Sequence, residues 1–225
     1  MLRRMIVRSI LGTALFGVVL FGPAGTLAWP QAWIFLALFI GCSVAMGIWL
    51  YRTDPGLLVE RMRSPLSRQQ KPADRLVVAA LLVAFWGWLI LAALDAKRFG
   101  WSYVPVWLQL VGAILILVAF YGWVTVMRAN SFAAVEIRLQ RERGQTVVST
   151  GPYAVVRHPM YSYALLLMVG TTLLLGSLWS LAAVPLLMLL LIARIDGEER
   201  LLRDGLPGYR DYSAKVRYRL VPGVW

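Results

Sequence analysis

The stretch MYSYALLLMVGTTLLLGSLWSLAAVPLLMLLLI, residues 160–192, decides the fold. It is apolar over about 33 residues, whereas one membrane-spanning helix needs about 20. The stretch is therefore too long for a single span without extreme tilt. Gly176-Ser177 divides it near the middle. We predict a hairpin of two short helices, residues 161–175 and 178–194, each about 25 Å long at 1.5 Å per residue.

The rest of the chain also has the composition of a membrane protein. Its 225 residues are 60% hydrophobic and 15% charged, whereas soluble domains are about half apolar and a quarter charged. The fold class predicted is therefore all-α, a polytopic membrane helical bundle of about six transmembrane segments. In the fourth segment, Gly112 and Gly122 permit close helix contact. The four segments before the hairpin are predicted at residues 9–28, 31–51, 76–94 and 104–126.

The first apolar run also has features of a signal peptide, because a charged start precedes it and Thr26-Leu27-Ala28 follows. We favour a retained transmembrane helix, since the next apolar run begins directly after Trp29-Pro30. Gly22, Pro23 and Gly25 are expected to kink or end this helix.

The net charge of +12 would suggest nucleic acid as a partner of a soluble protein. In a membrane protein, it indicates basic loops that are attracted to anionic headgroups. With both termini in the cytoplasm, every Lys and Arg except Lys97 and Arg98 falls on the cytoplasmic side. This asymmetry follows the positive-inside rule. We therefore expect cytoplasmic N and C termini, membrane lipids as partners and no nucleic acid.

Cys42 is the only cysteine and His158 is the only histidine. An intramolecular disulfide is therefore excluded, and a zinc site is not expected. We predict no metal cofactor.

Two charged clusters flank the predicted hairpin. Residues 151–161 precede it and residues 196–200 follow it. Because a hairpin returns the chain to the same face, we expect His158 and Glu198 to meet near the cytoplasmic interface. Ionisable groups that gather at a membrane boundary indicate a functional site.

These charged residues also have simpler interpretations. The Arg157 side chain could extend to the headgroups, and Pro159 after His158 favours a helix start. Glu198 and Glu199 could form a solvated helix end. However, the macrodipole disfavours carboxylates near the C-terminal end of a helix, so we expect a cationic or hydroxyl partner for them.

The C-terminal part of the chain contains four sequence motifs in a characteristic order. Gly151-Pro152-Tyr153 is followed by Arg157-His158-Pro159-Met160-Tyr161, then by Glu198-Glu199 and by Leu206-Pro207-Gly208-Tyr209-Arg210-Asp211-Tyr212. From about Asn130 to Trp225, this pattern closely resembles the isoprenylcysteine carboxyl methyltransferase family. It is also similar to the related membrane phospholipid methyltransferases.

The resemblance divides the chain into N-terminal transmembrane helices, residues 1–129, and a methyltransferase-like region, residues 130–225. It implies an integral-membrane methyltransferase that uses S-adenosyl-L-methionine. In the family, the Arg-His-Pro-x-Tyr block and the glutamate pair line the cofactor site. The cofactor-binding residues implied here are Tyr153, Arg157, His158, Pro159, Tyr161, Glu198 and Glu199.

Arg194 matches a family arginine one turn before the glutamates. We assign it the catalytic role, in which it orients a substrate carboxylate by a bidentate contact. Tyr163 departs from the family, whose members often have glycine there, and is expected to narrow the pocket or to face lipid. The implied acceptor is a lipidic or lipidated molecule, with carboxylate O-methylation favoured and phospholipid amine N-methylation as the alternative. The compact chain suggests a prokaryotic cytoplasmic membrane.

Two other classes of protein fit less well. Sterol reductases have a similar Arg-His-Pro block and use NADPH, but this chain is short for that class. A transporter or scaffold needs polar residues along a pathway, and Ser43, Gln109 and Thr125 are a small set.

Overall fold

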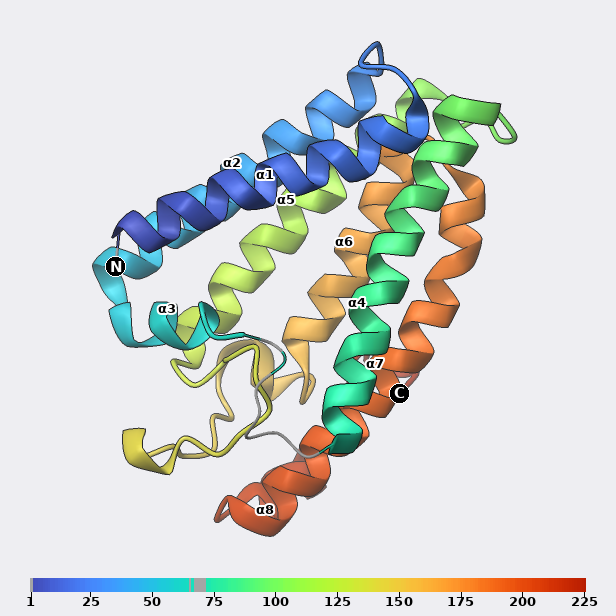
Figure 1. The fold of residues 1–225 in the computed structure, drawn as a ribbon. Helices are drawn as coiled ribbons and strands as arrows, with labels where there is room; N and C mark the ends of the chain where they lie inside the picture. The colour runs from blue at the N-terminus through green and yellow to red at the C-terminus, as the bar shows by residue number, and fades with distance from the viewer. Residues whose placement is uncertain (1, 65, 67–71) are drawn as a thin grey trace.

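The computed structural model describes residues 2–64, 66 and 72–225, and this part is helical without strands (Figure 1). Two 3-10 turns, η2 (Arg141–Arg143) and η3 (Gly151–Ala154), interrupt the long connection before α6. A π-helical turn, η1 (Leu94–Phe99), extends α4. The α-helices are α1 (Leu2–Ala24), α2 (Pro30–Thr53), α3 (Pro55–Arg61), α4 (Pro72–Ala93), α5 (Val106–Ala129), α6 (Pro159–Leu175), α7 (Leu178–Gly205) and α8 (Tyr209–Lys215).

Among the described residues, five helices are long and apolar enough to cross a membrane: α1, α2, α4 with η1, α5 and α7. The apolar helix α6 has 17 residues, so it reaches only about 25 Å of the roughly 30 Å hydrocarbon layer. The chain is therefore a multi-pass helical membrane protein, as predicted. Six crossings and cytoplasmic termini remain predictions.

The predicted helices agree with the structure except at some boundaries. The segment after the third predicted helix forms the π-helical turn η1. The largest difference is in α7, which continues to Gly205 instead of ending at Arg194. Its charged extension carries Leu202, which packs into the apolar cluster of Leu206, Tyr209 and Tyr212. Because the glutamate pair lies well before the end of α7, the macrodipole does not account for its partners, although the expected hydroxyl and cationic partners are present.

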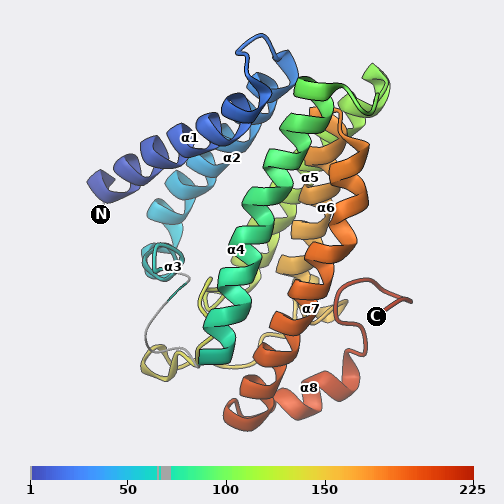
Figure 2. The same cartoon turned by 45° about the vertical axis from the view of Figure 1, so that its right-hand side comes forward.

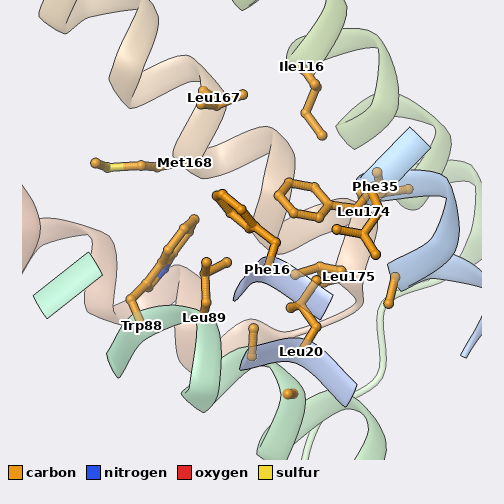
Figure 3. Packing of buried hydrophobic residues seen from close by; sticks show 14 of the residues in the cluster. Phe16, Leu20, Phe35, Trp88, Leu89, Ile116, Leu167, Met168, Leu174 and Leu175 are labelled. Carbon is orange, nitrogen blue, oxygen red and sulfur yellow. The ribbon is translucent and has the colours of Figure 1, made fainter. Parts of the chain in front are cut away.

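Large apolar side chains from most of the long helices form the core (Figure 3). Phe16 and Leu20 of α1 meet Phe35 of α2, Leu89 of α4 and Leu175 of α6, and all five are at least nine-tenths buried. In a membrane, tight packing rather than water exclusion holds helices together. This core therefore joins the α1–α2 hairpin to the remaining helices.

The close contact of α5 with α6 depends on glycine. A Cβ atom on Gly112 would lie 2.5 Å from the Leu174 backbone nitrogen and 2.6 Å from the Gly170 carbonyl oxygen. A Cβ atom on Gly122 would overlap the ring of Tyr163. Both glycines thus permit the close helix contact that the sequence predicts.

The two ends of the bundle differ in character. At one end, Asp95 Oδ2 accepts hydrogen bonds from Ser102 Oγ at 2.5 Å and Ser177 Oγ at 2.6 Å, which ties the α6–α7 turn to η1. At the other end lie α3, the connection after α5, the start of α6 and α8 (Figures 1 and 2). The hairpin therefore brings both charged clusters to the same end, as predicted.

Candidate functional site

The first half of the site is built around the start of α6. Pro159 occupies its first turn and His158 is its N-cap residue, a position in which proline favours helix initiation. The backbone N–H groups of Arg157 and His158 donate to the carbonyl oxygens of Tyr218 and Arg219, each at 2.9 Å. This pairing with the C-terminal segment fixes where both side chains lie.

Glu199 lies at the centre of a buried ion-pair cluster. Its Oε1 accepts a hydrogen bond from Arg157 Nε at 2.6 Å and lies 3.3 Å from His158 Nε2. Its Oε2 accepts from Arg203 at 2.8 Å and lies 3.2 Å from an Arg219 nitrogen. Only 3% of the side chain is exposed. Removing one member of such a buried cluster leaves the other charges uncompensated, which is strongly destabilising.

Glu198 points elsewhere, because successive residues of an α-helix are about 100° apart. Its Oε2 accepts a hydrogen bond from the Tyr161 hydroxyl at 2.9 Å and lies 3.9 Å from His158 Nδ1. The same hydroxyl accepts a hydrogen bond from Arg194 Nε at 2.9 Å. With 29% of its side chain exposed, Glu198 remains open to a ligand.

A polar cavity of about 90 Å³ lies between the connection after α5, the end of α7 and α8. The buried Tyr209 hydroxyl and Arg138 Nε face no hydrogen-bond partner within residues 2–64, 66 and 72–225. Glu136, also lining this cavity, is 5% exposed and forms no ion pair among those residues. Since buried polar groups in native proteins are usually partnered, this cavity has the donors and acceptors for a polar ligand.

Two tyrosines of the polar cavity remain neutral donors. Burial raises the pKa of Tyr153, although a hydrogen bond with Asn130 opposes the shift. Burial, together with the carboxylates of Glu199 and Glu198, raises the pKa of Tyr209. Both hydroxyl groups therefore keep their protons at neutral pH.

A second, apolar cavity of about 330 Å³ also has Arg157, His158 and Glu198 in its lining. Its volume is in the range of about 300–1,000 Å³ that is typical of small-molecule sites. Arg61 and Arg194 are charged groups of its lining. Its apolar walls come from α4 to α7 and include Val78, Leu81, Phe85, Trp123, Met168 and Leu191.

The two cavities share part of their lining, which contains four predicted site residues. Tyr161 and Arg194 line the apolar cavity alone. Pro159 and Glu199 line neither, and their contacts position the others. The shared lining consists of Ala133, Ala134, Tyr153, Arg157, His158 and Glu198.

Tyr163 lies over Gly122 and lines neither cavity, so of the two alternatives the structure does not support a narrowed pocket. Sequence reasoning also missed Arg61, Glu136 and Arg138. These three lie in connecting segments, where no periodicity indicates the direction of a side chain. Tyr209 belonged to a quoted motif but had no assigned role.

Within the described part of the chain, no group of three or more His, Cys, Asp or Glu side chains is arranged to hold a metal ion. Glu199 is instead paired with Arg157 and Arg203 and lies beside His158.

In this helical bundle, a polar and an apolar cavity meet at ionisable side chains. Such an arrangement is typical of the active site of a membrane enzyme. Residues 107–206 match the family model described as Phospholipid methyltransferase. This match confirms the resemblance to membrane methyltransferases and supports that activity for the chain. The match begins inside α5, earlier than the resemblance predicted from about Asn130, and it ends at Leu206, so it does not cover the resemblance predicted over residues 207–225. No curated protein matches the chain.

Proposed function

We propose that the protein transfers a methyl group from S-adenosyl-L-methionine to a lipidic acceptor, with carboxylate O-methylation favoured. The observation that carries this proposal is the lining shared by the two cavities. It offers one place where a polar donor and an apolar acceptor can touch. Phospholipid amine N-methylation is the second candidate, because the matched family is described by that substrate class.

The side chains of the polar cavity suit the cofactor. When bound, S-adenosyl-L-methionine supplies a methyl group on a sulfonium ion and leaves as a thioether. Glu198 and Glu136 suit its ammonium group and ribose hydroxyls, and Tyr209 and Arg138 suit its carboxylate. At about 90 Å³, the cavity is smaller than typical small-molecule sites. Binding of the whole cofactor therefore requires a larger cavity than the one in this structure.

A carboxylate acceptor needs little acid–base chemistry from the protein. Its oxygen forms a bond to the methyl carbon while the carbon–sulfur bond breaks, and that electron pair stays on sulfur. No proton has to leave. Arg194 orients the carboxylate, and the apolar walls exclude water, so catalysis consists of alignment and desolvation. An amine acceptor must also lose a proton, for which Glu198 is the nearest open carboxylate.

The proposal places the site at the cytoplasmic face of a prokaryotic cytoplasmic membrane. The distribution of Lys and Arg along the sequence supports this orientation. His158 and Glu198 lie at the end of the bundle that carries the basic connections.

Calorimetric titration of the purified protein with S-adenosylhomocysteine tests the proposal. We expect saturable binding, and His158→Ala or Glu198→Ala should weaken it at least tenfold, about 1.4 kcal/mol. Absence of binding to the folded wild-type protein would reject the proposal. Thermal stabilisation by NADPH instead of S-adenosyl-L-methionine would select the reductase class.

A further inference from the structure

Arg61 is held in place by the structure of α3. Asp54 caps this helix, since its Oδ1 accepts a hydrogen bond from the Leu57 backbone N–H at 2.8 Å. Leu57 and Leu58 are buried in a cluster with Met127 of α5. The helix therefore has a fixed position against α5, and Arg61 at its end reaches the apolar cavity.

The charge of Arg61 is not balanced by any carboxylate. All eleven Asp and Glu residues of the chain lie in its described part, and none forms an ion pair with Arg61. Its one hydrogen bond in the described part of the chain runs from Arg61 Nη1 to the uncharged Ala133 carbonyl oxygen, at 3.0 Å. Burial lowers the pKa of this guanidinium group. By contrast, Arg63 in the same connection pairs with Glu60 at 3.1 Å.

Arg194 brings a second cation to the same cavity. Its guanidinium group donates to the Val135 carbonyl oxygen, two residues beyond the carbonyl that Arg61 contacts. Two residues of extended chain span at most about 7 Å, so both arginines are anchored within a short distance. Between them, the described lining offers one carboxylate, Glu198, which already accepts a hydrogen bond from Tyr161. Arg194 is 9% exposed and Arg61 is half-buried. Charges that are withdrawn from water are usually paired, so this lining suits an anionic ligand.

We propose that Arg61 is a specificity-determining residue that selects an acceptor with an anionic headgroup. The headgroup lies between Arg61 and Arg194, and the apolar part of the acceptor lies against α4, α6 and α7. Carboxylate and phosphate headgroups share this chemistry. Arg61 lies outside the matched residues 107–206, so the N-terminal part of the chain contributes to acceptor choice. That this ligand is the methyl acceptor rests on the proposed function.

Binding of amphiphiles with identical chains tests the inference. The protein, in nanodiscs of phosphatidylcholine, is titrated with dodecanoate, dodecyl phosphate and the neutral dodecanamide. We expect at least one of the two anions to bind at least tenfold more tightly than the amide. The one that binds shows which headgroup the site takes. Arg61→Gln should remove most of this preference, Arg61→Lys should keep part of it, and the matched control Arg63→Gln should keep all of it.

Equal binding of all three amphiphiles to the wild-type protein would overturn the inference without any variant. So would an unchanged preference in a folded Arg61→Gln protein. If Arg61→Gln instead weakens binding of S-adenosylhomocysteine, Arg61 serves the cofactor and the inference is wrong. Loss of the proposed function looks different: S-adenosylhomocysteine then fails to bind the wild-type protein, while the preference for anions persists.

Discussion

Replacing Glu199 by Gln is expected to destabilise the protein strongly. The substitution keeps the shape of the side chain but removes the negative charge that Arg157 and His158 contact at 2.6 and 3.3 Å. The Arg157 side chain is 6% exposed, so water cannot replace the lost partner. Breaking a buried ion pair in this way costs about 3–5 kcal/mol. For a chain of this size, that corresponds to a fall in Tm of roughly 6–20 °C.

Thermal unfolding in detergent, followed by tryptophan fluorescence, measures this effect. Glu198→Gln is the matched control, because it makes the same chemical change at the neighbouring residue. With 29% of its side chain exposed, Glu198 should contribute less than about 1 kcal/mol to stability, while its loss should weaken S-adenosylhomocysteine binding. If Glu198→Gln lowers Tm more than Glu199→Gln does, the division between a structural and a ligand-binding glutamate is wrong.

Two further predictions follow from close packing and from unpartnered atoms. Tyr209→Phe should leave Tm unchanged or slightly raised, because the buried hydroxyl has no partner among the described residues. It should also weaken S-adenosylhomocysteine binding by roughly 2–10-fold. Unchanged affinity in calorimetry would remove Tyr209 from the cofactor site. Gly122→Ala should lower Tm because its Cβ atom overlaps the Tyr163 ring, whereas Gly87→Ala, with open space around it, should not. Adding Tyr163→Ala should restore much of the loss, and a strictly additive double mutant would refute the direct contact.

The sequence predicts the long helices of the bundle well because each contains an apolar run that is bounded by Pro, Gly or charged residues. The short helices α3 and α8 have no such run. The sequence misjudges α7, whose last turns carry Asp196, Glu199 and Arg203. The high share of charged residues in this segment suggests a loop. These side chains are retained in a helix because Glu199 is neutralised by Arg157 and Arg219 from elsewhere in the fold and by Arg203 one turn along its own helix. Hydropathy carries no information on such pairing.

The sequence also predicts that His158 and Glu198 meet, since a hairpin must return the chain to the same face. It does not separate the roles of Glu198 and Glu199, because adjacent glutamates look equivalent until the rotation of the helix is known. Arg61 and Glu136 were missed for a related reason. Their positions at the two cavities depend on how the connections after α2 and α5 fold over the bundle, and such paths leave no regular pattern in the sequence.

The lining common to the polar and apolar cavities also has a thermodynamic consequence. Arg157, His158 and Glu198 belong to both cavities, so any rearrangement that one ligand causes alters the surface that the other ligand meets. By linkage, each ligand then changes the affinity of the other by the same factor. Measured affinities for the two ligands are thus coupled quantities, and each has meaning only when the occupancy of the neighbouring cavity is stated.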